Sequence, residues 1–267
     1  VIGKEAVTNK VADLNSVQLP FKSLARTSAQ ERNAQYQPGG EHIAFISNRS
    51  GQDQIWLWHA QREQAHQLST ELSQGLINNV SWSPDGKRLA WTANGKLAIL
   101  DLQGNQVNVT ADKLINSVLA WHQENQLLVL VDDPVPGGMY LLNLDDNKLT
   151  PYGINYVESA WVHQGYLYYS DLDGDVFVRN FHRRVDEKIA ENKPLPQLNG
   201  KAMFIQGEFI YSVDQTDFML NQYGSQGQLV KAMMQLKPTA WKVTGLKGNK
   251  LLLSQFIAID HDIVMIE

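Results

Sequence analysis

The sequence repeats one unit of short apolar runs separated by tight turns, and this unit limits what the chain can fold into. Its clearest copy, from Val80 to Thr110, contains four runs and three turns. The turns include Asp85-Gly86 and Asn94-Gly95, residues that tolerate the positive φ angles of tight hairpins. Each run has the usual length of a β-strand. A single meander of this size cannot bury both of its faces, so it must pack against further copies.

The second run of the unit recurs six times at intervals of about 40 residues. Its copies begin at Ile43, Leu89, Leu127, Leu167, Phe209 and Leu251. An aromatic residue precedes each copy, and these residues are Tyr36, Trp82, Trp121, Trp161, Phe204 and Trp241. Four strands per repeat at this period predict an all-β fold, a six-bladed β-propeller of four-stranded antiparallel blades. We expect the aromatic rings to lie between blades.

The two ends of the sequence predict how the ring closes. The third run of the last repeat, Ile263–Ile266, is followed only by Glu267, so this repeat lacks a fourth strand. Phe21–Ser28 resembles the fourth-strand segments of other repeats. We therefore predict that a strand within Leu19–Ser28 pairs with Ile263–Ile266 in the last blade. The predicted domains are a linker or short cap over residues 1–16 and a single propeller over residues 17–267.

Two repeats resemble a known family. Gln37-Pro38-Gly39-Gly40 with IAFISNRSGQDQIW, and Ser83-Pro84-Asp85-Gly86-Lys87 with RLAW, are similar to the TolB-type propeller repeat. The later repeats keep the spacing but lose the SPDG turn. TolB itself carries a separate N-terminal domain. Because the first repeat begins at Arg32, we expect that domain to be absent from this chain.

Composition narrows the function classes. The net charge is −5 and the basic residues are scattered, which argues against a nucleic-acid surface. The chain has no cysteine, no signal peptide and no apolar run long enough to span a membrane. It begins at Val1 rather than Met, which fits a mature form or an excised domain.

Metal and catalytic motifs are incomplete. Asp171, Asp173 and Asp175 have the first three ligand spacings of a calcium loop, but Val176 and His182 replace its glycine and its glutamate. The alternative is an ordinary β-turn, where Asp and Gly are favoured. No zinc motif and no G-x-S-x-G elbow occurs. We therefore predict a protein without cofactor and without catalytic activity, and leave open a metal site assembled across blades.

Asparagines recur where the first strand of successive blades begins. The pattern I-N-x-V occurs at Ile77, Ile115 and Ile154. In a propeller these connections surround one mouth of the central channel, where amides can donate and accept hydrogen bonds. The alternative is that each amide caps its own loop. We predict a binding site for a partner or small polar ligand that contains Asn33, Asn78, Asn116, Asn155 and Asn199.

The resemblance implies a protein-interaction or sensing module in a bacterial periplasm. TolB-like propellers also form the extracytoplasmic sensor of membrane-anchored transcriptional regulators of the CadC/ToxR type, and we expect that context here. The membrane would then be reached only through a segment outside this chain. The alternative is an accessory propeller of a prolyl-oligopeptidase-like hydrolase, or a propeller enzyme. A transmembrane span upstream or a catalytic domain downstream would discriminate the two.

Overall fold

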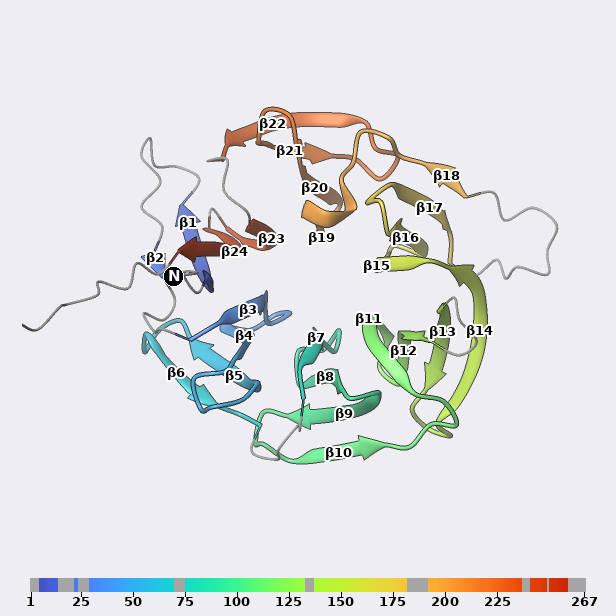
Figure 1. Cartoon of the computed structure of the whole chain (residues 1–267). Helices are drawn as coiled ribbons and strands as arrows, with labels where there is room; N and C mark the ends of the chain where they lie inside the picture. Colours follow the sequence, from blue (N-terminus) through green and yellow to red (C-terminus); the bar gives the residue numbers. More distant parts are fainter. Residues whose placement is uncertain are drawn as a thin grey trace, which may run out of the picture.

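Six four-stranded antiparallel sheets stand around a central axis in a propeller ring (Figure 1). The structure is a computed structural model, and it describes residues 5–13, 22–23, 29–69, 75–132, 137–181, 192–236, 241–248 and 250–258. The predicted all-β fold of four-stranded antiparallel sheets in a propeller is confirmed.

The first three sheets each use four consecutive strands. Sheet 1 contains β3 (Glu31–Tyr36), β4 (His42–Ser47), β5 (Gln54–His59) and β6 (Gln64–Gln67). Sheet 2 contains β7 (Ile77–Trp82), β8 (Arg88–Ala93), β9 (Lys96–Asp101) and β10 (Gln106–Val109). Sheet 3 contains β11 (Ile115–Gln123), β12 (Gln126–Val131), β13 (Gly138–Asn143) and β14 (Lys148–Asn155).

The remaining sheets complete the ring. Sheet 4 contains β15 (Val157–His163), β16 (Tyr166–Asp171), β17 (Val176–Asn180) and β18 (Lys193–Pro194). Sheet 5 contains β19 (Met203–Gln206), β20 (Phe209–Val213), β21 (Met219–Tyr223) and β22 (Leu229–Gln235), preceded by the short 3₁₀ helix η1 (Gly200–Ala202). Sheet 6 contains β23 (Trp241–Lys247), β24 (Lys250–Ala258), β1 (Glu5–Asp13) and β2 (Lys22–Ser23). All six predicted second runs lie in the second strand of their sheet.

The strand order of sheet 6 differs from the predicted closure. An N-terminal strand does complete the last sheet, but β1 takes the third position and pairs with β24 from Glu5 opposite Ala258 to Asp13 opposite Lys250. The outer strand is β2, which pairs with β1. Residues 5–13 therefore form a strand and are not the predicted linker or cap. Without this strand, β24 would present unpaired backbone groups at an edge. The predicted partner, residues 263–266, lies outside the described residues.

Apolar side chains fill the interfaces between neighbouring sheets. Trp82 packs in a cluster shared by sheets 1 and 2, and Trp121 in one shared by sheets 2 and 3. Both rings are buried, as predicted, and so is Phe204. Tyr36 and Trp161 are partly buried against their clusters. Trp241 begins β23, and its side chain is outside the described part of the chain.

Contacts between sheets 6 and 1 close the ring, and both β24 and β1 lie against β3. Leu252 of β24 packs with Ala34, Ile43 and Phe45 of sheet 1. The hydroxyl of Tyr36 donates to the Lys250 carbonyl at 3.2 Å. Side chains of the last sheet thus seal against the first, as the other sheets do with their neighbours.

The turns fix how closely sheets approach. Ser83 Oγ donates to Asp85 Oδ1 at 2.6 Å and accepts from the Arg88 amide at 2.9 Å, which shapes the SPDG turn. Gly86 adopts a positive φ of 69°. A Cβ atom there would lie 2.3 Å from the carbonyl oxygen of Pro38 in sheet 1, so the two turns can meet only around a glycine.

Candidate functional site: the central channel and its mouth

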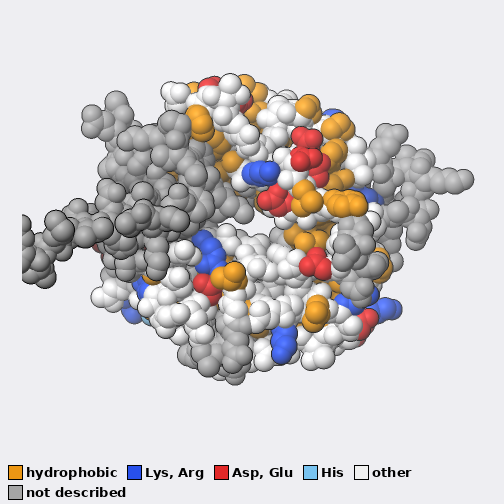
Figure 2. Space-filling model, viewed as in Figure 1, with side chains coloured by type: hydrophobic (Ala, Val, Ile, Leu, Met, Phe, Trp, Pro, Cys, Tyr) orange, Lys and Arg blue, Asp and Glu red, His pale blue; other side chains and the backbone are white. Residues whose placement is uncertain are grey.

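The innermost strands of all six sheets line a cavity of about 290 Å³ on the axis of the ring. Figure 2 shows the opening of this channel at the centre of the molecule. The lining combines polar side chains with aromatic rings and aliphatic side chains. Lining residues include Asn33, Gln35, Asn79, Ser81, Trp82, Trp121, Glu158, Ser159, Trp161, His163, Phe204 and Thr244.

The channel wall is polar but nearly uncharged. Glu158 supplies a carboxylate and His163 an imidazole among the lining side chains. Burial lowers the pKa of His163 below its ordinary value, although nearby Glu208 acts in the opposite direction. His163 is therefore neutral at neutral pH, and its buried Nε2 has no hydrogen-bond partner within the described part of the chain. Such a wall suits a polar, weakly charged group that brings its own donors and acceptors.

Three predicted asparagines form a relay at one mouth of the channel. We call this side the connection face, the side on which β7, β11 and β15 begin. The side-chain Nδ2 of Asn33 donates to the backbone carbonyl of Asn78 at 3.0 Å. The side-chain Nδ2 of Asn78 donates to the backbone carbonyl of Asn116 at 2.7 Å and to its Oδ1 at 3.0 Å. Each bond crosses from one sheet to the next. These amides link blades, which neither the ligand-collar nor the loop-cap interpretation predicted.

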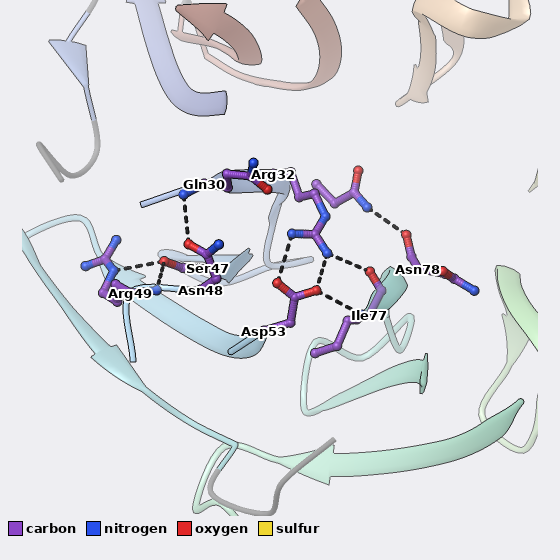
Figure 3. Close-up of polar contacts among 9 residues, drawn as sticks. Gln30, Arg32, Ser47, Asn48, Arg49, Asp53, Ile77 and Asn78 are labelled. Carbon is purple, nitrogen blue, oxygen red and sulfur yellow. Dashed lines mark hydrogen bonds and ion pairs between the residues drawn. The ribbon is translucent and has the colours of Figure 1, made fainter. Parts of the chain in front are cut away.

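An ion pair between Arg32 and Asp53 lies next to the relay and bonds to the first residue of β7 (Figure 3). Arg32 Nη1 donates to Asp53 Oδ1 at 3.1 Å, and the Asp53 side chain is only 4% exposed. Asp53 Oδ2 accepts from the Ile77 amide at 3.0 Å, while Arg32 Nη2 donates to the Ile77 carbonyl at 3.1 Å. The pair therefore fixes both peptide groups at the start of β7. The sequence showed no signal for it, since Arg32 and Asp53 lie in no recurring motif.

The other two asparagines stay outside the relay. Asn155 is the last residue of β14 and lies opposite Gly138 in the outer part of sheet 3. The I-N-x-V match at Ile154 is three residues out of step, because Val157 opposite Asp171 is the counterpart of Ile77 opposite Ala93. Glu158 consequently occupies the position of Asn78.

Asn199 acts as a local cap. Its Oδ1 accepts from the Lys201 amide at 3.1 Å, at the start of η1. Its own backbone amide donates to Ser212 Oγ at 2.9 Å. The loop-cap interpretation therefore describes this residue.

The three aspartates of the calcium-like segment form a turn. Asp171 Oδ1 accepts from the amides of Asp173, Gly174 and Asp175, each at 3.0 Å. One carboxylate oxygen thus satisfies the backbone of the loop, as in an ordinary Asx turn. Among the residues that the structure describes, no group of three or more His, Asp or Glu side chains is arranged to hold a metal ion.

Within the described ranges, no helix is both long and apolar enough to cross a membrane.

Solved structures with the same fold were found, but relatives in sequence were not. No protein-family model matches this chain, and no curated protein does. A structure described as a putative TolB from Agrobacterium tumefaciens superposes with a TM-score of 0.71 at 12% identity, covering 96% of this chain and 100% of that one. The chain has the fold of a TolB-like β-propeller.

Two further structures agree with this fold. TolB from Acinetobacter baumannii gives a TM-score of 0.62 at 11% identity, covering 96% of this chain. The present chain spans only 64% of the length of that protein. A nidogen/laminin complex gives a TM-score of 0.64 at 8% identity, covering 85% of this chain and 93% of that one. Identities this low establish the fold alone.

Proposed function

We propose that this chain is a non-enzymatic binding module whose partner or small polar ligand is held at the mouth of the central channel. The observation that carries the proposal is the channel itself, a cavity to which all six innermost strands contribute polar side chains and rings. A ring of sheets holds such side chains rigidly, and rigid placement lowers the entropic cost of binding. One of the structures with this fold was solved as a complex between two proteins, nidogen and laminin.

The relay and its neighbours form the recognition surface in this proposal. Asn33, Asn78 and Asn116 present their remaining donors and acceptors at the mouth, and Glu158 supplies a carboxylate beside them. Asn155 and Asn199 flank this surface. The ring is a closed six-bladed propeller.

The cellular role that we propose is the extracytoplasmic sensory domain of a membrane-anchored transcriptional regulator, located in the periplasm. Support comes from the resemblance to TolB-type repeats and from the TolB-like fold. The coding sequence around this chain tests the role directly. A winged-helix segment and a membrane span upstream would support it, whereas a catalytic domain downstream would contradict it.

A channel-filling variant tests the binding site. Ser81→Trp adds a large ring to the channel wall, and Gln103→Trp adds the same ring to an exposed turn at the end of β9. Each variant would be immobilised and exposed to an extracytoplasmic extract, and the retained proteins and small molecules identified by mass spectrometry. We expect a species that the unmodified chain and Gln103→Trp retain and Ser81→Trp loses. Identical retention by all three would contradict a channel site.

A further inference from the structure

The connection face carries an arc of exposed apolar side chains at equivalent positions of three sheets. Leu76, Leu114 and Tyr156 are 72%, 69% and 57% exposed. Each directly precedes the first buried residue of an innermost strand, Ile77, Ile115 or Val157. Repetition of an exposed large apolar residue at one structural position is unlike the scattered apolar residues of an ordinary surface.

A fourth residue extends the arc on sheet 4. Val157 pairs with Asp171, so Tyr156 and Leu172, the residues next to that pair along the chain, both lie at the same end of the β15–β16 ladder. Leu172 is 58% exposed. Figure 2 shows hydrophobic side chains beside acidic ones at the rim of the channel, on the side of sheets 3 and 4.

The backbone holds two of these side chains outward. Tyr156 has a φ of 58°, a conformation that bulky residues rarely adopt. Leu114 lies over the turn of the neighbouring sheet, because a Cβ atom on Gly95 would be 3.1 Å from the Leu114 Cβ. These exposed side chains are therefore positioned by the fold rather than left loose in solvent.

A cavity adjoins the arc. It has a volume of about 730 Å³ and lies between β9, β10 and the segment leading into β11. Its wall includes Trp91, Leu97, Val109 and Leu114. A cavity beside an exposed apolar strip can accept an apolar anchor side chain, the usual centre of a protein interface.

The arc is acidic at one end, the end on sheet 4. At its sheet 4 end, Glu158, Asp173 and Asp175 are exposed, and Lys201 lies alongside them over Gly174. Carboxylates outnumber the ammonium group there, which disfavours an anionic lipid surface and favours a cationic partner.

We propose that the arc Leu76, Leu114, Tyr156 and Leu172 binds an extended segment of another polypeptide chain that combines apolar side chains with Lys or Arg. An apolar side chain of the segment enters the cavity beside Leu114. Its cationic side chain lies against Glu158, Asp173 and Asp175. This inference rests on the proposed function as a binding module and names the chemistry of its partner.

The test uses random linear peptides displayed on phage and selected on the immobilised full chain. We expect recovered peptides to combine apolar residues with Lys or Arg. A synthetic peptide of the recovered consensus, followed by fluorescence anisotropy, should bind Leu114→Glu and Tyr156→Asp about tenfold more weakly or worse. The matched control is Leu229→Glu, because Leu229 is 60% exposed but lies on β22, the outer strand of sheet 5, which carries no residue of the arc. It should bind as the unmodified chain does.

One more variant tests the acidic end of the arc, and several outcomes would overturn the proposal. Glu158→Gln should weaken binding about threefold and reduce its dependence on salt. Recovery of acidic peptides, recovery of none, binding only to a second copy of this chain, or equal effects of Leu114→Glu and Leu229→Glu would overturn it. If Ser81→Trp abolishes peptide binding while the arc variants leave it intact, this inference fails and the channel site stands. If the peptides bind all variants equally, both fail.

Discussion

The side-chain amide of Asn78 links sheet 2 to sheet 3. Its bonds to the Asn116 carbonyl and Oδ1 would be lost in Asn78→Ala. Because an intramolecular hydrogen bond contributes a net 0.5–1.5 kcal/mol, we expect the free energy of unfolding in urea to fall by about 1 kcal/mol. Asn155→Ala, at an exposed strand end, is the comparison and should change stability by less than about 0.5 kcal/mol. Equal losses would show that the relay does not couple the sheets.

We expect His42 of sheet 1 to make stability depend on pH. The rings of His42 and His59 lie 5.0 Å apart between centroids, and His42 Nδ1 is 2.7 Å from Gln37 Oε1. Burial, followed by the charges of His59 and His66, lowers the pKa of His42 from its ordinary value of 6.5. The folded state therefore binds fewer protons than the unfolded state below that value. Stability should fall as the pH drops through about 6.5 towards the lowered pKa.

The variant His42→Gln tests this dependence. Replacing the imidazole with a side chain that does not titrate should flatten the decrease in unfolding free energy between about pH 7 and pH 5. The measurement is urea denaturation at a series of pH values. An unchanged slope would assign the dependence to other groups, such as His163, whose pKa is also lowered by burial.

At the scale of elements, the turns of sheets 1 and 2 offer a matched pair of glycines. Gly86 and Gly39 have φ angles of 69° and 64°. A Cβ atom on Gly86 would lie 2.3 Å from the Pro38 carbonyl oxygen, whereas one on Gly39 meets nothing within 4 Å. Gly39→Ala should cost about 1 kcal/mol from backbone strain alone, and Gly86→Ala clearly more. Similar midpoints of thermal unfolding would mean that the two turns separate freely.

The strands that could be predicted from the sequence are those with strong apolar runs. Each second strand, such as β8 with Leu89 and Trp91, is buried on both faces and reads as a continuous apolar segment. β1 was missed because its residues, EAVTNKVAD, show no clean alternation. It is a strand because β24 offers it an edge, and this cause lies at the far end of the chain.

The candidate site was predicted only where local pattern and position agree. Asn33, Asn78 and Asn116 do meet at the mouth, but their bonds to neighbouring sheets depend on how the sheets pack. Asn155 was included because I-N-x-V repeats by coincidence at the end of β14. Arg32 and Asp53 come together across sheet 1 and hold sheet 2, which a pattern within one repeat cannot reveal.

For the whole molecule, the pairing of β1 with β24 predicts the effect of truncation. Deleting residues 1–14 removes β1, leaving nine residues of β24 without their partner on one side. Several lost ladder bonds at about 0.5–1.5 kcal/mol each approach the ~5–15 kcal/mol that holds a domain folded. We expect a large fall in melting temperature and increased light scattering, since an open edge promotes aggregation.

Deleting residues 1–4, which precede β1, is the control and should leave both measurements unchanged. If the longer deletion also left them unchanged, β1 would not be needed to complete sheet 6.

The pairing of β1 with β24 also limits when sheet 6 can form during translation. β1 leaves the exit tunnel before sheets 1 to 5, and its partner β24 leaves it after them. Until β24 emerges, β2 is therefore the strand of its own sheet with which β1 can pair, while sheets 1 to 5 can assemble as they emerge. Any nascent chain that terminates before Lys250 carries a strand that nothing within it can pair with along its length. Emergence of β24 is thus the condition for completing sheet 6 and closing the ring.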